Sequence, residues 1–478
     1  MEARRLRDSG RIPDAARLLE AYVHAHPTDP IAAGLLGETR YWLKDVAGAR
    51  AAYEEGLGAA PRDIALKLAY ARMLIETSAG GRARQLLEPL RLTGETHGRA
   101  EEMLGTLAYW SGDYVTATRR FNEALSLDPG REDARRSLRE ILIVTAPWVR
   151  VGGDVQHDDQ PLDRVTGDAQ AGWFITPLVS LTGRVQPMRL RDGTGLTRTM
   201  LLGDAALAAY LPATRLEIEL AAGGIQRANA STDWTGHAGF GARLTPRLIV
   251  HARAERAPYL FTVASMFTPI MTTTLGASVD WSHSRGWLGQ AAATRTTFPD
   301  RNAVTGAYAW LLAPLVNADR SSVQLGYSLT AQTSDETRFE PSGVPVSPRN
   351  GDPVKGTYDP YHTPVNLLAH SAIAALATRP SSRVELRFNG AVGVSAHEEI
   401  LVWRTAGGPR PGAPSIVFAE REFRPWTIRG SIRAQVATRM HLLTEFEYSR
   451  TAFYGAGAAR VSLTKSFPTA ALRRLEQR

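Results

Sequence analysis

Three groups of residues carry side chains that could do acid–base chemistry: His157-Asp158-Asp159, Ala396-His397-Glu398-Glu399, and the pair Glu445 and Glu447. Catalysis would also need a nucleophile or an activating group at hydrogen-bond distance, and no spacing here places one. The stretch from Ala396 is typical of the start of a solvated loop. The chain has no cysteine, no His-Glu-x-x-His, no Gly-x-Ser-x-Gly and no glycine-rich phosphate loop. We therefore expect neither an enzyme nor a metal site or cofactor.

The pair Glu445 and Glu447 belongs to a wider pattern, in which charged and apolar residues alternate. In residues 215–220 and 383–388, Arg or Glu holds every odd position and an apolar residue every even one. A period of two is that of a β-strand whose two faces meet different surroundings. The charged row that this pattern selects is Arg184, Arg215, Glu217, Glu219, Arg253, Glu255, Arg383, Glu385, Arg387, Arg429, Arg433, Glu445 and Glu447.

Burying these charges without partners would cost too much, so the row must line water, a plug or a polar substrate path. The same residues could instead form cross-strand ion pairs that only stiffen the wall. The sequence supports both interpretations, and they are compatible. We take the thirteen residues as candidates for the lining of a pore.

The connections between strands indicate what kind of sheet positions this row. About sixteen strands follow Pro147, and tight turns alternate with longer polar loops at 187–197, 257–271, 333–364 and 396–425. Short turns at one end and long loops at the other are typical of a transmembrane β-barrel, whereas a soluble sandwich does not sort its loops in this way. The tight turns are Thr176-Pro177, Pro212-Ala213, Thr245-Pro246-Arg247, Ser284-Arg285-Gly286, Arg379-Pro380-Ser381 and Thr438-Arg439.

Two further features fit a barrel. An even number of strands places both ends of the barrel on the turn side, which would be the periplasmic side. The last strand, from Tyr454 to Phe467, ends on an aromatic residue, as the terminal strand of outer-membrane barrels does, and a basic tail at 468–478 follows.

The first 144 residues repeat with a period of 34. Members of the lattice are Ala15, Ala49, Ala83 and Ala117; Leu19, Tyr53, Leu87 and Phe121; and Pro27, Pro61 and Pro129. The last unit, from Leu104-Gly105 to Asp128-Pro129, resembles the tetratricopeptide repeat (TPR). That resemblance implies an α-solenoid of four helical pairs with a final helix from Arg131 to Val144, and either a groove for protein segments or a bare scaffold. The phase sets the start of the first unit about five residues before Met1, so we expect a truncated repeat and a signal peptide upstream.

Charge and hydropathy limit the alternatives. No run of eighteen apolar residues exists that would form a membrane-crossing helix. Residues 1–144 hold 21 basic and 21 acidic residues, so the remaining 35 and 27 account for the net charge of +8. A basic balance often indicates nucleic acid, but this part has no helical basic stripe, and we expect no nucleic-acid partner.

A TPR array followed by a barrel of this size resembles the exopolysaccharide export porins, among them the outer-membrane subunits for poly-N-acetylglucosamine and cellulose, and the YaiO-type barrels. The stretch 356–364 is similar to a Tyr-x-Pro-x-Tyr-like segment before a late strand of those barrels. Four repeats are fewer than in the cellulose subunits. A basic barrel also departs from the acidic lumen expected of the poly-N-acetylglucosamine type, and it favours an anionic or neutral polymer.

The predicted fold is multidomain α + β: a TPR solenoid over 1–144, an antiparallel transmembrane barrel of about sixteen strands over 145–467, and a periplasmic tail over 468–478. We expect an export porin for a secreted polysaccharide, gated by loops 333–364 and 396–425. The barrel would lie in the bacterial outer membrane against lipid and lipopolysaccharide, with the repeats binding periplasmic proteins. Two alternatives remain: a non-conducting membrane anchor for the repeats, and a general diffusion porin.

Overall fold

The structure, a computed structural model, describes residues 2–77, 79–92, 94–228, 231–268, 270–343, 348–405, 414–451 and 455–477. It divides into two compact units, Met1–Thr145 with Thr469–Arg478, and Ala146–Pro468. None of the described helices is long and apolar enough to cross a membrane.

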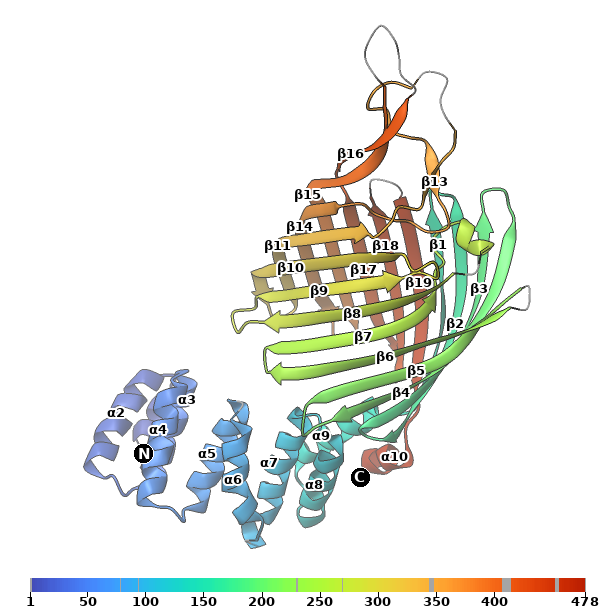
Figure 1. The fold of residues 1–478 in the computed structure, drawn as a ribbon. Helices are drawn as coiled ribbons and strands as arrows, with labels where there is room; N and C mark the ends of the chain where they lie inside the picture. Colours follow the sequence, from blue (N-terminus) through green and yellow to red (C-terminus); the bar gives the residue numbers. More distant parts are fainter. Residues whose placement is uncertain are drawn as a thin grey trace. The chain divides into compact units, whose positions relative to one another are not determined.

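The first unit is helical and follows the 34-residue lattice (Figure 1). Its elements are α1 (Glu2–Asp8), α2 (Ile12–Ala25), α3 (Pro30–Trp42), α4 (Val46–Ala59), α5 (Ile64–Glu76), α6 (Gly80–Leu87), η1 (Glu88–Leu92), η2 (Gly94–Thr96), α7 (His97–Trp110), α8 (Tyr114–Leu127), α9 (Glu132–Val144) and α10 (Ala470–Gln477). The predicted TPR-like solenoid is confirmed.

Small residues at fixed lattice positions let paired helices approach each other. The four alanines at the position of Ala15 are fully buried. A Cβ added to Gly37 would lie 2.6 Å from the Tyr53 ring, and one added to Gly105 would lie 2.8 Å from the Phe121 ring. These distances are shorter than any normal contact. The aromatic ring of each repeat therefore occupies the space that a side chain at the glycine would need.

Aspartates on the same lattice start several of the helices. Asp29 and Asp63, 34 residues apart, accept hydrogen bonds from backbone amides of the first turns of α3 and α5. Asp45 and Asp113, two periods apart, do the same for α4 and α8. Each carboxylate satisfies amides that have no partner inside the helix, so local capping and the repeat period specify the same boundaries.

The C-terminal residues 468–478, predicted to be a separate tail, contain a helix of the first unit. Leu472 of α10 is fully buried, and α10 packs on α9. The pattern of Ala470, Leu472 and Leu475 among basic residues is that of a short amphipathic helix.

The second unit is a closed antiparallel β-barrel. Its strands are β1 (Trp148–Asp158), β2 (Leu162–Thr176), β3 (Val179–Asp192), β4 (Thr197–Leu211), β5 (Leu216–Arg227), β6 (Thr232–Thr245), β7 (Leu248–Pro258), β8 (Met271–Ser282), β9 (Leu288–Thr297), β10 (Ala303–Ala318), β11 (Ser321–Ser334), β14 (Leu367–Ser381), β15 (Val384–Arg404), β17 (Trp426–Ala437), β18 (Met440–Arg450) and β19 (Gly455–Ser466). β1 closes the ring on β19, in a register from Trp148↔Ser466 to Asp158↔Ala456. The predicted sixteen-stranded barrel is confirmed over the described residues. Tyr454, the predicted start of the last strand, lies outside them.

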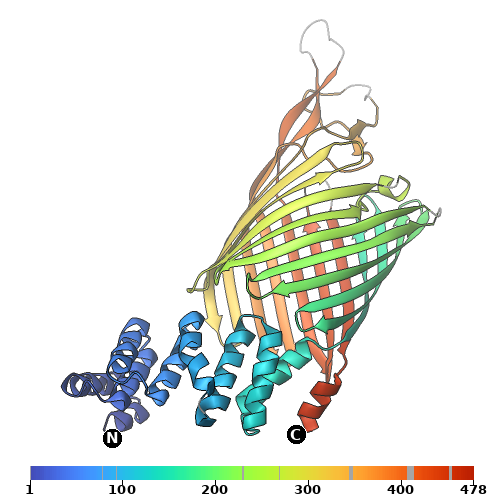
Figure 2. The ribbon, with the colours of Figure 1, turned by 60° about the horizontal axis from the view of Figure 1, so that its bottom comes forward.

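Three shorter strands and a 3-10 helix lie in the loops. β12 (Phe339–Pro341) pairs with β13 (Gly356–Tyr358), η3 (Ala264–Met266) lies between β7 and β8, and β16 (Ser415–Phe423) pairs with the far part of β15. Figures 1 and 2 show the β15–β16 hairpin extending beyond the other strands. We call the end of the barrel with these loops the loop end, and the other, where Trp148 and Ser466 lie, the turn end.

Seven short connections lie at the turn end: 177–178, 212–215, 246–247, 283–287, 319–320, 382–383 and 438–439. The turn at 319–320 was not predicted, and Arg379-Pro380-Ser381 lies in the last residues of β14. Residues 187–197, predicted to be a long loop, mostly extend β3 and β4, and only 193–196 connect them. Residues 396–404 and 415–423 are likewise strand, and 406–413 lie outside the described residues.

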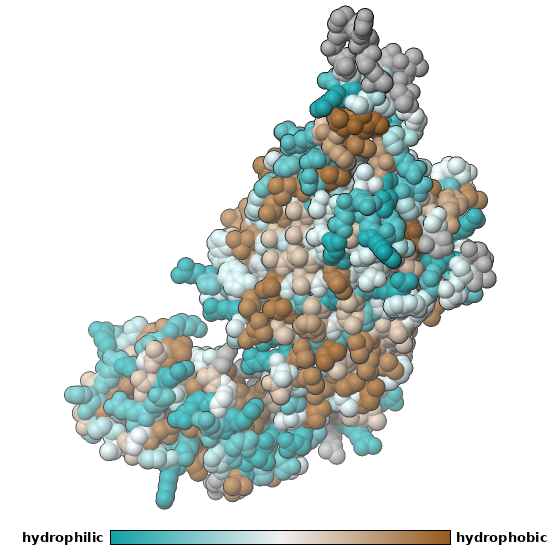
Figure 3. Space-filling model, viewed as in Figure 1, coloured by the Kyte–Doolittle hydropathy of each residue, from teal (hydrophilic) through white to brown (hydrophobic). Residues whose placement is uncertain are grey.

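The two faces of the wall differ as the alternation predicts. Val151, Leu220, Leu275 and Val461 are each about half exposed on the outer face, where Figure 3 shows hydrophobic side chains over the strands. Aromatic residues gather on this face near both strand ends, at Trp173, Trp281 and Phe467 and at Trp234, Trp426 and Tyr448. An apolar band between two aromatic girdles is the outer surface of an outer-membrane barrel.

The glycine–aromatic contact in the repeats gives a stability test. We expect Gly105→Ala to destabilise the helical unit by about 1–3 kcal/mol because the new Cβ would force the buried Phe121 ring to move. Gly58→Ala in α4 is the control: its Cβ would meet no atom within 4 Å, so it should stabilise by up to about 1 kcal/mol through helix propensity. Urea unfolding of the full chain, followed by the far-UV helix signal, measures both, and equal midpoints would contradict the packing argument.

Candidate functional site: the barrel lumen and its mouth

The inner face of the wall carries most of the predicted charged row. Eleven of the thirteen candidates stand on strands, in the positions that alternate with the outer apolar residues: Arg184 on β3, Glu217 and Glu219 on β5, Arg253 and Glu255 on β7, Glu385 and Arg387 on β15, Arg429 and Arg433 on β17, and Glu445 and Glu447 on β18. Arg215 and Arg383 lie instead in turns, immediately before β5 and β15. That any of these residues lines a substrate path stays a prediction.

Many of the charges on the inner face are joined in ion pairs. Arg387 binds Glu385 at 2.6 Å, and Arg429 binds Glu447 across the β17–β18 pair at 2.7 Å. Arg253 binds Glu255 at 3.1 Å. Such pairs lower the cost of a charged wall and hold the side chains against it.

Several partners on the inner face were not singled out from the sequence. Asp204 on β4 accepts from Arg184 Nε at 2.8 Å. Nε2 of His237 on β6 lies 3.0 Å from Glu219 Oε1. Asp204 and His237 stand among Gly and Ala residues, where polar and apolar side chains do not alternate clearly. Only their position in the strand register relative to the outer-facing Leu207 and Leu220 assigns them to the inner face.

Towards the loop end, the inner face becomes apolar. Met188 and Leu190 on β3, Met200 and Leu202 on β4, and Ile225 on β5 are buried, although they stand in the lumen-facing row. Leu260 and Met266 of the β7–β8 connection pack on them in one cluster. The connection 259–270, with η3, therefore lies against the inside of the wall, and we call it the inner loop.

The described residues of a second connection, 335–343 and 348–366, include those that pack on the inner loop, and we call them the outer loop. Thr262 Oγ1 donates to the Pro360 carbonyl at 2.6 Å, and the His362 amide donates to Tyr259 Oη at 3.3 Å. The Phe298 and Tyr361 rings stack with centroids 3.5 Å apart. Two loops from different parts of the barrel thus form one packed layer at the mouth.

Tyr361 and Asp300 form the polar latch of this layer. Tyr361 Oη donates to Asp300 at 2.7 Å, and Arg338 Nε donates to the same carboxylate at 2.7 Å. Burial opposes ionisation of Asp300, but these two donors outweigh it and hold the Asp300 pKa below its usual value. Burial, with Asp300 as acceptor, raises the pKa of Tyr361 to about 12. All three belong to loops, and Tyr361 lies in the stretch 356–364 noted from the sequence.

Glu398 corrects one sequence interpretation. It was placed at the start of a solvated loop, but β15 continues through it, and its side chain is only 1% exposed. Arg421 on β16 binds it at 2.5 Å. This ion pair joins β15 and β16, the two strands of the hairpin. The hairpin in turn holds the outer loop, because the Trp403 amide on β15 donates to the Asp352 carbonyl at 2.9 Å.

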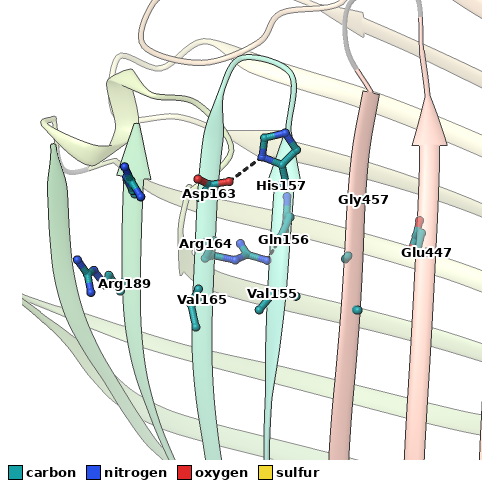
Figure 4. Close-up of a pocket in the computed structure, with 12 residues that line it drawn as sticks. Val155, Gln156, His157, Asp163, Arg164, Val165, Arg189, Glu447 and Gly457 are labelled. Carbon is teal, nitrogen blue, oxygen red and sulfur yellow. Dashed lines mark hydrogen bonds and ion pairs between the residues drawn. The ribbon is translucent and has the colours of Figure 1, made fainter. Parts of the chain in front are cut away.

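The His157-Asp158-Asp159 group has a structural account. Asp158 Oδ1 accepts from the Gln160 and Leu162 amides at 3.0 and 2.9 Å and so shapes the β1–β2 turn. His157 Nδ1 lies 2.6 Å from Asp163 Oδ1, on the outer face (Figure 4). This pair borders a surface hollow of about 610 Å³, also lined by Arg189 and Arg191.

A closed sixteen-stranded barrel with an apolar band, joined to TPR-like repeats, defines an outer-membrane barrel protein with a helical repeat unit. No family model and no curated protein matches the chain. Among solved structures, one titled "Bacterial polysaccharide outer membrane secretin" is 10% identical and aligns over 68% of this chain and 99% of its own, with TM-score 0.49. CdiB from Acinetobacter baumannii is 8% identical over 67% and 60%, with TM-score 0.38. MamA is 16% identical over 29% and 81%, with TM-score 0.27.

Acid should loosen the mouth. Burial lowers the pKa of His362 in the outer loop to about 4, from an unperturbed 6.5. Since the folded loop holds the neutral form, its stabilisation is complete above pH 6.5 and is lost as the pH falls towards 4. A nitroxide attached at Phe261→Cys, in a chain without cysteine, should become more mobile over this range.

The matched variant is His362→Asn in the same labelled chain, which removes the titrating group. We expect its nitroxide mobility to change much less between pH 7 and pH 4.5. Loosening at the same pH in both chains would assign the effect to other groups.

Proposed function

We propose that the barrel is a gated export conduit for a secreted polysaccharide in the bacterial outer membrane, with the turn end in the periplasm. The observation that carries this proposal is the contrast between the two parts of the lumen. The wall is a closed ring of sixteen strands with a polar inner face, whereas loops joined mainly by side-chain contacts cover its mouth. A ring of this size encloses a water-filled channel when nothing plugs it.

The inner face suits a polymer that must pass without being held. Its charges are largely paired, as in Arg387–Glu385 and Arg429–Glu447, so each pair offers hydrogen bonds to hydroxyl groups without a strong net charge. A series of weak polar sites favours movement along the wall, because binding has to be reversible at each one.

The mouth has the construction of a gate. Two hydrogen bonds, Thr262–Pro360 and Tyr259–His362, join the inner and outer loops. The Phe298–Tyr361 stack with its latch to Asp300 joins the outer loop to the β9–β10 connection. Breaking them leaves the strand ladder intact. The predicted gate loops 333–364 and 396–425 therefore need one addition in this proposal, the inner loop 259–270.

The helical unit would recruit periplasmic proteins that make or modify the polymer. Trp42 and Trp110, two repeat periods apart at the ends of α3 and α7, are 44% and 58% exposed. Exposed tryptophans are common at protein-binding surfaces. The lipid-facing band would contact outer-membrane lipid and lipopolysaccharide.

Single-channel conductance of the full chain in a planar bilayer tests the conduit. We expect low conductance from the native chain and a stable increase from Tyr361→Ala, which removes the stacked ring and its hydroxyl. Tyr361→Phe is the matched control, because it keeps the stacked ring and loses only the hydrogen bonds to Asp300. Its channel should open less often than that of Tyr361→Ala. Oligosaccharides added at the turn side should block the opened channel.

The alternatives predict other results. A membrane anchor for the repeats predicts no conductance even after residues 261–268 are replaced by a short Gly-Ser linker. A general diffusion porin predicts high conductance of the native chain and no block by oligosaccharides. Either result would overturn the conduit proposal.

A further inference from the structure

The excess positive charge of the barrel is concentrated in its short turns. Residues 146–468 contain 32 Lys and Arg against 26 Asp and Glu. The seven connections of the turn end contain six arginines and one acidic residue, Asp319, so the rest of this segment is nearly balanced, with 26 and 25. The basic character noted from the sequence is therefore a property of one rim and not of the wall.

Five of these arginines occupy the same position in five different hairpins. Each is the last residue of its turn, and its carbonyl accepts a hydrogen bond from a backbone amide of the next strand along the wall. We call them the rim arginines. The bonds run from the amides of Arg243, Ser282, Arg379, Gln435 and Ser466 to the carbonyls of Arg215, Arg247, Arg320, Arg383 and Arg439, at 2.8–3.2 Å. The rim arginines are thus fixed to the barrel and distributed around its opening.

Backbone conformation shows that two of these positions are costly for arginine. Arg215 has φ 53° and Arg439 has φ 58°, in the left-handed region that glycine and asparagine adopt most easily. Arginine there costs about 1 kcal/mol relative to glycine. Folding alone would favour glycine at both turns, as it would at Arg301 in the β9–β10 connection, which has φ 70°.

Along the sequence, each rim arginine stands two residues before a lumen-facing position of the strand that follows it. Arg215, Arg383 and Arg439 each stand two residues before an inner-face residue, namely Glu217, Glu385 and His441. Arg247 and Arg320 precede inner positions of β7 and β11 in the same way. Arg215, Arg247, Arg320 and Arg383 are exposed, whereas Arg439 is half-buried.

We infer that the rim arginines form an entrance site for an acidic polysaccharide, one whose sugars carry carboxylate, sulfate or phosphate groups. This inference rests on the proposed function and adds the charge of the substrate. A guanidinium pairs with such groups through two parallel hydrogen bonds. A ring of five at the rim would raise the local concentration of a polyanion before it meets the balanced wall.

Inside the ring, acidic residues would release the polymer. Glu217 and Glu385 follow Arg215 and Arg383 by two positions, and Glu385 is already bound to Arg387. An anionic chain captured at the rim therefore meets carboxylates and ion pairs rather than free positive charge. Strong binding is confined to the first layer, as transport through a pore requires.

Equilibrium binding tests the entrance site without needing an open gate. The probe is a fluorescent oligogalacturonate, compared with a neutral cello-oligosaccharide of equal length, and the full chain is held in phosphatidylcholine nanodiscs. We expect the native chain to bind the acidic probe at least tenfold more tightly, with affinity falling as salt is added. Changing all five rim arginines to Gln should remove this preference, and changing them to Lys should keep most of it.

A matched control removes the same charge elsewhere: Arg189, Arg191, Arg301, Arg349 and Arg404, all exposed and none in the seven connections of the turn end, are changed to Gln. It should bind within threefold of the native chain. If the control variant lost as much affinity for the acidic probe as the rim variant, the loss would be explained by net charge and the entrance site would be refuted. No preference in the native chain, or unchanged binding by the five-Gln variant with altered behaviour only in anionic-lipid nanodiscs, would overturn the inference and assign the ring to lipid. If the chain binds the acidic probe but never conducts, the entrance site stands and only the conduit proposal is refuted.

Discussion

The structure depends on one constraint, that the backbone amides and carbonyls of the wall must find partners on neighbouring strands. In lipid no water replaces a missing partner, so a sheet can cross a membrane only as a closed ring. The seam between β1 and β19, paired over eleven residues from Trp148 to Asp158, removes the last free edges. Closure also fixes register, because a slip of one residue would turn every inner side chain towards the lipid.

Given that register, the chemistry of each row follows from what it meets. The outer row is mainly apolar between its two aromatic girdles, while the inner row carries ion pairs such as Arg429–Glu447 and then an apolar patch around Leu190 and Ile225. Such a patch would be unfavourable in a water-filled lumen, and burying it against Leu260 and Met266 explains why the inner loop folds inwards. The apolar patch on the inner face of the wall is therefore the reason that the inner loop covers the mouth.

Periodicity predicted the repeats, the sixteen strands and eleven of the thirteen candidate positions, because each depends on local alternation or spacing. It failed where contacts distant in sequence decide. Residues 187–197 were read as a loop because Arg189 and Arg191 are polar, yet the intervening Met188 and Leu190 make this a strand covered by the inner loop. Glu398 was read as solvated because only the return of β16 brings Arg421 to it. Arg215 was placed in a strand because alternation does not report its left-handed φ.

The two ends of the barrel differ in what would have to break for them to change. At the turn end, the backbone carbonyl of each rim arginine is hydrogen-bonded to the neighbouring strand, and only the side chain is left out of these bonds. The positive charges are therefore attached to a rigid rim. At the loop end, the latch of Tyr361, Asp300 and Arg338 consists of side chains on loops. Each such bond contributes only about 1–3 kcal/mol net, so the mouth can open at a cost far below that of unfolding a strand. In the proposed conduit, a rigid entrance at the turn end and a movable exit at the loop end would set the direction of transport.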